Sequence, residues 1–251
     1  MNKIVVEIDE SADLDKLLTF IVEKCRQTGV KHTVKVDALN SVTSIEEQRK
    51  LYSSPIEVGE KVAFKILTAR TKRFGFKECK TYRKIIEIES GFAFGDGTHP
   101  TTKMCVETIE KYIKQDATVL DIGCGSGILA LTALALGAKE ALGIDISPHA
   151  ILNAQKNAEL NHVADRLKVV EGNLTDSVTG KYDLIIANML TDPIISLLND
   201  IHGYMKSNGI IILSGIPYFR ENEVMESAEK FSVIDRMTKD EWVCLVLQSV
   251  E

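Results

Sequence analysis

Three glycines that follow an apolar strand form the pattern most indicative of ligand binding in this sequence. Residues 119–122 (Val-Leu-Asp-Ile) lead into Gly123, Gly125 and Gly127, and an apolar helix is expected from Ile128 onward. Glycine has no Cβ atom to block a ligand, and it adopts backbone angles that other residues avoid. Open α/β proteins bind nucleotides where a parallel strand runs into a helix N-terminus. The segment therefore predicts a site for a nucleotide or nucleoside.

The spacing of these glycines separates two classes of ligand. Dinucleotide-binding proteins carry Gly-x-Gly-x-x-Gly, in which the third glycine permits close helix packing beside the pyrophosphate. Here the third glycine comes one residue earlier, and Asp121 precedes the series. A carboxylate suits the ammonium group of an amino-acid tail. The pattern therefore favours S-adenosylmethionine over a nicotinamide dinucleotide.

An acidic residue ends the next predicted strand. Asp145 lies 22 residues after Gly123, and a carboxylate at that position typically hydrogen-bonds the ribose hydroxyls of a nucleoside. The alternative is that Asp145 caps the following helix, but Ser147 stands at the better capping position. We therefore expect Asp145 and its neighbour Ile146 to contact the cofactor.

Two further segments follow predicted strands at the same edge. Asn173 and Leu174 come after the third strand, where an adenine ring would lie, although a plain loop is the alternative. Asn188 ends the fourth strand, beside the expected position of the reacting group. Its amide offers one acceptor and two donors, so it can orient a nucleophilic amine without carrying charge. A strand-end turn is the alternative for Asn188.

Residues 91–102 precede the glycine series and are unusually rich in special residue types. They contain three glycines, two aromatic residues and three threonines, which favours an ordered loop over the ligand rather than a linker. Thr102 is expected to bond the amino-acid end of the cofactor. His99 is a candidate proton acceptor, although a histidine in such a loop more often fixes the loop's structure.

Strand–helix alternation from Thr101 onward must position these residues, and it predicts an α/β fold with a mostly parallel, doubly wound sheet. A short turn at Lys239-Asp240 predicts an antiparallel hairpin at the sheet edge. Ser147-Pro148 and Asp192-Pro193 are typical helix starts. The expected strands are 118–122, 141–145, 167–170, 184–187, 210–214, 231–236 and 242–248, and the expected helices are 129–136, 148–160, 193–205 and 220–230.

The first ninety residues predict a separate, small α+β domain. We find no catalytic constellation in it, and its basic run 70–73 indicates a solvated hairpin tip rather than a substrate clamp. The predicted organisation is 1–90 for substrate recognition, 91–102 as a cofactor loop and 103–251 as the cofactor-binding domain. The elements expected in the small domain are strands at 3–8, 30–36, 61–68 and 82–88 and a helix from Ser11 to Gly29.

Composition and charge exclude several classes of protein. The 251 residues are 45% hydrophobic and 26% charged, which excludes disordered, collagen-like and coiled-coil chains. The net charge of −6 argues against a sequence-independent nucleic-acid binder. The longest apolar stretch, Ile128 to Ala138, is about half the length of a membrane-spanning helix, and no signal peptide is evident. Five scattered cysteines lack metal-ligand or redox spacing. We expect a cytoplasmic protein with reduced thiols, no metal and no membrane contact.

The motifs together resemble those of class I S-adenosylmethionine-dependent methyltransferases. Within that class they resemble the PrmA family, which methylates the eleventh protein of the large ribosomal subunit. The family's signature is G-[LF]-A-F-G-T-G-x-H-P-T-T, D-[IV]-G-C-G-S-G-I-L, G-[IV]-D-I and A-N-[IL]-L. The matching segments are 91–102, 121–129, 143–146 and 187–190, within a resemblance that spans about residues 88–215.

The resemblance implies a Rossmann-like fold, S-adenosylmethionine as methyl donor and S-adenosylhomocysteine as product. It places cofactor contacts at Thr102, Gly123, Asp145 and Asn188. It further implies N-methylation of a protein amine, a lysine side chain or the N-terminus, as in the ribosomal protein L-eleven. The reaction is then an in-line displacement in which the enzyme aligns a neutral amine with the methyl group. We expect Asn188 and backbone carbonyls near Met189 to orient the nitrogen, without a dedicated base.

Several departures from the family's pattern keep other substrates open. Asp96 replaces the usual Thr, and Met189 replaces Ile or Leu. The family's tryptophan-rich front segment is missing, since the only tryptophan of this chain is Trp242. About 90 residues precede the loop, fewer than in the family's usual substrate-gripping front domain. A small-molecule amine is therefore the alternative substrate. RNA is less favoured, because Met189-Leu190 lack the prolines and aromatic residue that hold a flipped base. A non-catalytic cofactor-binding protein is a further alternative.

Overall fold

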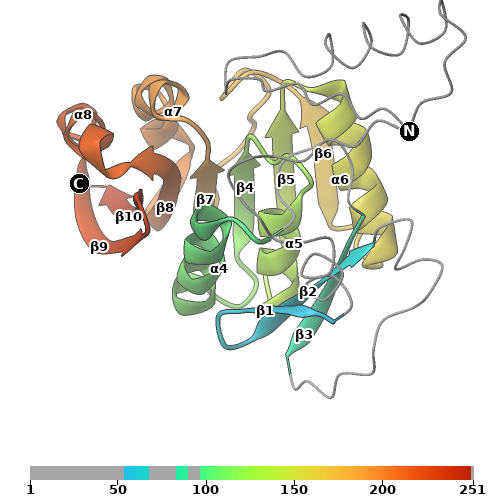
Figure 1. The fold of residues 1–251 in the computed structure, drawn as a ribbon. Coiled ribbons are helices and arrows are strands. Elements are labelled where there is room, and N and C mark those ends of the chain that lie inside the picture. The colour runs from blue at the N-terminus through green and yellow to red at the C-terminus, as the bar shows by residue number, and fades with distance from the viewer. Residues whose placement is uncertain (1–53, 68–82, 90–96, 250–251) are drawn as a thin grey trace, which may run out of the picture. The chain divides into compact units, whose positions relative to one another are not determined.

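A seven-stranded sheet forms the centre of the part of the chain that the structure describes (Figure 1). The computed structural model describes residues 54–67, 83–89 and 97–249, all within a compact unit of residues 45–251. The spatial strand order is β6-β5-β4-β7-β8-β10-β9. The strands are β4 (Thr118–Ile122), β5 (Glu140–Asp145), β6 (Leu167–Glu171), β7 (Tyr182–Asn188), β8 (Met205–Pro217), β9 (Phe231–Lys239) and β10 (Trp242–Ser249).

Strand directions confirm the predicted fold class. Strands β6, β5, β4, β7 and β8 are parallel to one another. Strand β10 runs antiparallel to both β8 and β9. The predicted Rossmann-like sheet with a C-terminal antiparallel hairpin is thus present. All carboxyl ends of the parallel strands meet at one edge, and the first residue of β10 reaches that same edge.

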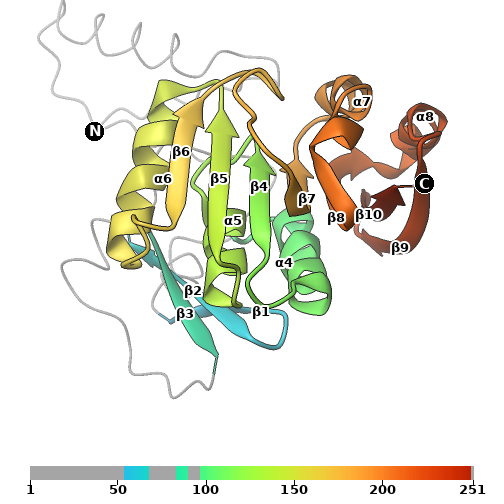
Figure 2. The ribbon, with the colours of Figure 1, turned by 180° about the vertical axis from the view of Figure 1, so that it is seen from behind.

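Helices cover both faces of the sheet (Figures 1 and 2). Alternate residues of each central strand point to opposite faces, so Val119 belongs to one apolar cluster and its neighbour Leu120 to the other. Central parallel strands are therefore apolar along their whole length. Helices α4 (Pro100–Tyr112), α5 (Ile128–Ala135) and α6 (Pro148–Leu160) pack in the first cluster, and α7 (Thr191–Leu198) and α8 (Glu221–Ser227) in the second.

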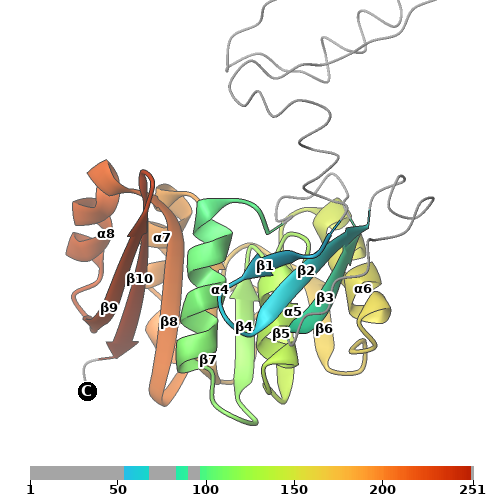
Figure 3. The same ribbon diagram turned by 60° about the horizontal axis from the view of Figure 1, so that its bottom comes forward.

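A second, three-stranded sheet lies over helices α4–α6 (Figure 3). It contains β1 (Ile56–Val58), β2 (Val62–Leu67) and β3 (Lys84–Glu89). The strands predicted at 61–68 and 82–88 are therefore confirmed. The elements predicted at 3–8, 11–29, 30–36 and 70–73 lie outside the described residues. A domain boundary at residue 90 stays a prediction.

Two predicted helices are wrong in their limits. The helix expected at 193–205 begins at Thr191 instead, ends at Leu198 and is followed by the 3₁₀ turn η1 (Ile201–Tyr204). Met205 leaves this path because it pairs with Tyr182 as the first residue of β8. The helix expected at 220–230 is a 3₁₀ turn, η2 (Tyr218–Arg220), followed by the shorter α8.

Three observations concern membrane-spanning helices, cysteines and metal sites in the part of the chain that the structure describes. No helix in this part of the chain is long and apolar enough to cross a bilayer. Cys105, Cys124 and Cys244 are free and buried. Across residues 54–67, 83–89 and 97–249, no three His, Cys, Asp or Glu side chains cluster in a way that would hold a metal ion.

Candidate active site

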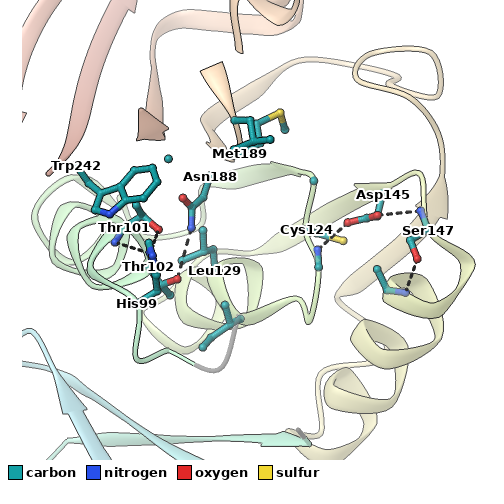
Figure 4. A pocket seen from close by; sticks show the side chains of 16 residues that line it. His99, Thr101, Thr102, Cys124, Leu129, Asp145, Ser147, Asn188, Met189 and Trp242 are labelled. Atoms are coloured by element: carbon teal, nitrogen blue, oxygen red, sulfur yellow. Dashed lines mark hydrogen bonds between the residues drawn. The ribbon is translucent and has the colours of Figure 1, made fainter. Parts of the chain in front are cut away.

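A cavity of about 530 Å³ opens at the carboxyl edge of the large sheet (Figure 4). Its walls come from the ends of β4, β5, β7 and β8, the N-termini of α4, α5 and α6, and the start of β10. Asp145 and Ser147 lie at one end, and His99 and Trp242 lie at the other. The lining residues are His99, Thr101, Thr102, Gly123, Cys124, Gly125, Ile128, Leu129, Asp145, Ser147, Ala150, Asn188, Met189, Leu190, Gly215 and Trp242.

The three glycines of the motif divide between two tasks. Gly123 and Gly125 line the cavity, whereas Gly127 does not. Gly127 is the N-cap of α5 with φ +78°, and a Cβ there would lie 3.1 Å from the Cβ of Ala154 on α6. The third glycine therefore permits α5 and α6 to pack closely, while the first two leave room for a ligand.

Asp121 has a different surrounding from the one expected. Its side chain is buried at 1% exposure, and its Oδ2 accepts a hydrogen bond from the Ala130 N–H at 3.0 Å. Burial raises the pKa of this carboxyl to about 7. Asp121 does not line the cavity. The structure thus places Asp121 at the first turn of α5, and its contact with the ammonium group of a cofactor stays a prediction.

Asp145 joins the glycine loop to the start of α6. Its Oδ2 accepts from the Gly125 N–H and its Oδ1 from the Ser147 N–H, both at 2.9 Å. Each carboxylate oxygen keeps a second lone pair for a ligand hydroxyl. Ser147 caps α6 by accepting from the Ala150 N–H at 3.5 Å, as predicted. Ile146 stands between these two lining residues and is 69% exposed.

The segment predicted for the adenine ring lies outside the cavity lining. The Gly172 N–H donates to the Asp145 carbonyl at 3.1 Å, which holds this segment beside the end of β5. Asn173 is exposed, and Leu174 packs against the second apolar cluster with φ +50°. Contacts of Asn173 and Leu174 with a cofactor stay predictions.

At the other end of the cavity, Asn188 is hydrogen-bonded to helix α4. Its Nδ2 donates to the Oγ1 of Thr102 at 3.5 Å. Thr102 lies near the start of α4 and is 1% exposed. Among the residues that the structure describes, none donates a hydrogen bond to the side-chain oxygen Oδ1 of Asn188. This acceptor is therefore available beside the cavity.

The backbone of Met189 is tightly held beside Asn188. Its N–H donates to the Ser214 carbonyl at 3.0 Å. Gly215 has φ +85°, and a Cβ on it would approach the Met189 carbonyl oxygen to 2.3 Å. Only glycine therefore fits at position 215. Gly215 could not be recognised from the sequence, because a lone glycine after a predicted strand carries no spacing signal.

His99 has structural partners that account for its position. It is the N-cap of α4, and its Nδ1 accepts from the Thr101 N–H at 3.3 Å and lies 2.8 Å from the Thr101 hydroxyl. Its ring meets that of Trp242 edge-on, with centroids 5.3 Å apart. These contacts favour the loop-fixing role over the proton-accepting one.

Trp242 is a site residue that sequence reasoning missed. It begins β10 and pairs with Pro217, the last residue of β8, so the antiparallel hairpin brings it to the cavity. The predicted hairpin contained this information, since an antiparallel strand starts where its parallel neighbours end. The other lining residues that the sequence did not single out are Thr101, Cys124, Ile128, Leu129, Ala150, Leu190 and Gly215.

The charge of the lining bears on the class of ligand. No lysine or arginine is among the described lining residues, and Asp145 is the one carboxylate there. A lining without cations and with one carboxylate accommodates a sulfonium and an ammonium group. The cavity's chemistry therefore agrees with S-adenosylmethionine as the ligand.

Comparison with known sequences identifies the family. The profile of the family described as "Ribosomal protein L11 methyltransferase (PrmA)" matches residues 2–250. The chain belongs to this family. The L11 methyltransferase of Clostridium perfringens (strain ATCC 13124) is 36% identical over 245 residues, which are 94% of this chain and 76% of that protein. The one from Clostridium botulinum (strain Eklund 17B) is 35% identical over 242 residues, 93% of this chain and 75% of the relative.

Solved structures agree with this assignment. The L11 methylase of Lactobacillus delbrueckii subsp. bulgaricus superposes with a TM-score of 0.72 at 29% identity, over 79% of this chain and all of that one. The Thermus thermophilus 16S rRNA N2 G1207 methyltransferase, solved with AdoMet and guanosine, shares the fold at a TM-score of 0.54 and 20% identity. This L11 methyltransferase family member is thus an enzyme of the S-adenosylmethionine-dependent class, as the sequence predicted.

Proposed function

We propose that this enzyme transfers methyl groups from S-adenosylmethionine to amines of ribosomal protein L11, on lysine side chains or the N-terminus. The observation that carries the proposal is one cavity with two chemically different ends. Asp145, bonded to the Gly125 N–H, lies at one end, and Asn188, bonded to Thr102, lies toward the other. Family membership supports both the methyl donor and the ribosomal protein as the acceptor.

The first end of the cavity fits the donor's nucleoside. Asp145 would accept hydrogen bonds from the two ribose hydroxyls, and the exposed Ile146 side chain offers an apolar surface to the adenine ring. Toward the Asn188 end, Thr102 and the backbone at Gly123 would hold the amino-acid tail. When bound, S-adenosylmethionine supplies an electrophilic methyl group on a positively charged sulfur. The cationless lining described above is compatible with that charge.

The second end of the cavity fits an amine. The carbonyl oxygens of Asn188 and Met189 would accept hydrogen bonds from the amine and direct its lone pair toward the methyl group. A lysine amine of pKa about 10.4 must lose a proton first, and burial lowers that pKa because it disfavours the charged form. The proton passes to solvent, the N–C bond forms as the S–C bond breaks, and S-adenosylhomocysteine leaves. Holding two reactants in line is the enzyme's main contribution.

The proposed substrate also predicts the enzyme's location and binding partners. Its protein substrate is part of the ribosome, so we expect a cytoplasmic enzyme that contacts L11 directly and has no membrane or direct nucleic-acid contact. A small-molecule amine acceptor is the alternative that the experiment must distinguish.

Transfer of a tritiated methyl group in a cell extract tests the proposal. The purified chain and labelled S-adenosylmethionine are added to an extract of its own organism, and the products are separated by size. We expect label in a band that antibodies identify as L11. Label in small metabolites or in RNA, with none in L11, would overturn the assignment of the substrate.

A further inference from the structure

We infer that Leu190, Tyr218 and Phe219, here called the mouth patch, form a docking surface for a polypeptide substrate. The patch would hold apolar residues that flank the target lysine. This inference rests on the proposed function, because it requires a protein acceptor. It adds a recognition surface within the catalytic domain.

The mouth patch is unusually exposed for its composition. Phe219 is 72% exposed, Leu190 70% and Tyr218 60%. Large apolar side chains grouped on a surface mark sites of interaction with other molecules. Tyrosine in particular is enriched among the residues that carry most of the binding energy in protein interfaces.

The patch lies at the mouth of the catalytic cavity. Leu190 lines the cavity and directly precedes α7. Tyr218 and Phe219 directly follow Pro217, which pairs with the cavity residue Trp242. The Tyr218 N–H also donates to the Glu241 carbonyl at 3.0 Å. A polypeptide whose amine reaches the cavity beside Leu190 would therefore extend over this patch.

An ion-pair network links the two segments that carry the patch. The Arg220 Nη2 lies 2.6 Å from both Asp192 Oδ1 and Glu223 Oε2. Asp192 is in the first turn of α7, so this arginine ties η2 to the segment that carries Leu190. The rings of Tyr218 and Phe219 meet edge-on with centroids 5.8 Å apart. A surface held in its binding shape loses less entropy when a partner binds.

Size and charge select a lysine-bearing polypeptide as the occupant. A cavity of about 530 Å³ is of the size that accommodates a single small ligand. The nucleoside therefore fills much of it, and the rest of the acceptor must lie outside, over the mouth. Around η2 the carboxylates outnumber the guanidinium groups, which favours a cationic segment over an anionic one such as RNA. These charged residues are Asp192, Glu221, Glu223 and Glu241 against Arg220 and Arg236.

A pair of matched double variants tests the inference. Tyr218→Ser with Phe219→Ser removes the two rings from the patch. Val233→Ser with Ile234→Ser removes two neighbouring exposed apolar side chains, 39% and 40% exposed, from edge strand β9. Each protein is assayed with purified L11 at saturating S-adenosylmethionine, and binding of S-adenosylmethionine is measured separately by calorimetry. Thermal unfolding checks that each variant is folded.

We expect the first variant to raise the KM for L11 by about tenfold or more, as the loss of hot-spot residues does. Its affinity for S-adenosylmethionine should stay within about twofold, and the β9 variant should resemble the wild type. An unchanged KM in the first variant, with an active wild type, would overturn the docking surface alone. A wild type that does not methylate L11 would overturn the proposed function and this inference with it.

Discussion

At the scale of single residues, the site depends on backbone atoms at the end of β7 that pack closely against the backbone of β8. Asn188 ends β7, and the N–H of the next residue, Met189, donates to the Ser214 carbonyl of β8. Gly215 then passes so near that its missing Cβ leaves space for the Met189 carbonyl. Residue spacing predicted Asn188, since it stands at a strand end. It did not predict Gly215, whose importance arises only when two strands lie side by side.

Gly215→Ala should lower kcat by about tenfold or more, because the added Cβ displaces the carbonyl that we assign to the amine. Steady-state kinetics with L11 measures this effect. Gly180→Ala is the matched control, since Gly180 has the same φ of +85° and a Cβ there meets nothing within 4 Å. An equal loss of kcat in both variants would contradict the assigned role of Gly215.

Asp121 should make stability depend on pH. Its pKa is raised to about 7 by burial, against an ordinary value of 3.8. The folded state therefore binds more protons between about pH 4 and pH 7, and the free energy of unfolding falls as pH rises through that range. The size of the effect is up to about 4 kcal/mol for this buried group.

Denaturant unfolding at several pH values checks this dependence. Asp121→Asn keeps an acceptor for the Ala130 N–H but does not titrate. We expect the variant's free energy of unfolding to be flatter between pH 4 and pH 7 than that of the wild type. Parallel curves for the two proteins would show that Asp121 is not the titrating group.

At the scale of elements, the structure shows why some predictions held and others did not. The helix at 148–160 was predicted correctly because Ser147 and Pro148 mark its start. The helix expected at 193–205 was predicted to end too late, because apolar spacing continues through Met205. Met205 instead pairs with Tyr182 in the sheet, and this pairing limits the helix. Local pattern gives the existence of an element, but long-range pairing sets its limits.

Asn157 connects three elements, and its loss should destabilise the fold. It is fully buried on α6, accepts from the Glu89 N–H of β3 at 2.8 Å and donates to the Ser126 carbonyl of the glycine loop at 2.9 Å. Asn157→Ala should cost about 2–4 kcal/mol, because it removes two buried hydrogen bonds. Thermal unfolding measures the loss, with the exposed Asn199→Ala as control. A cost equal to that of the control would contradict this role.

At the scale of the whole molecule, sequence and structure give different parts of the account. Strand–helix alternation was enough to predict the α/β class and the cofactor edge, because parallel strands place their ends together. Strand–helix alternation did not predict which residues line the part of the cavity that receives the methyl acceptor. Trp242 reaches the cavity through the antiparallel hairpin, and the turn after β8 carries Tyr218 and Phe219 of the mouth patch. A net charge of −6 agrees with a cationic protein substrate.

The most direct test of the central claim is mass spectrometry of purified L11 after incubation with S-adenosylmethionine and either the wild type or Asn188→Ala. We predict methylated L11 with the wild type, and a rate about a hundredfold lower with the variant, as for loss of a group that aligns a reactant. Binding of S-adenosylmethionine by the variant, measured by calorimetry, should stay within a few-fold of the wild type. L11 left unmethylated by the wild type, or methylated equally fast by Asn188→Ala with intact cofactor binding, would contradict the account.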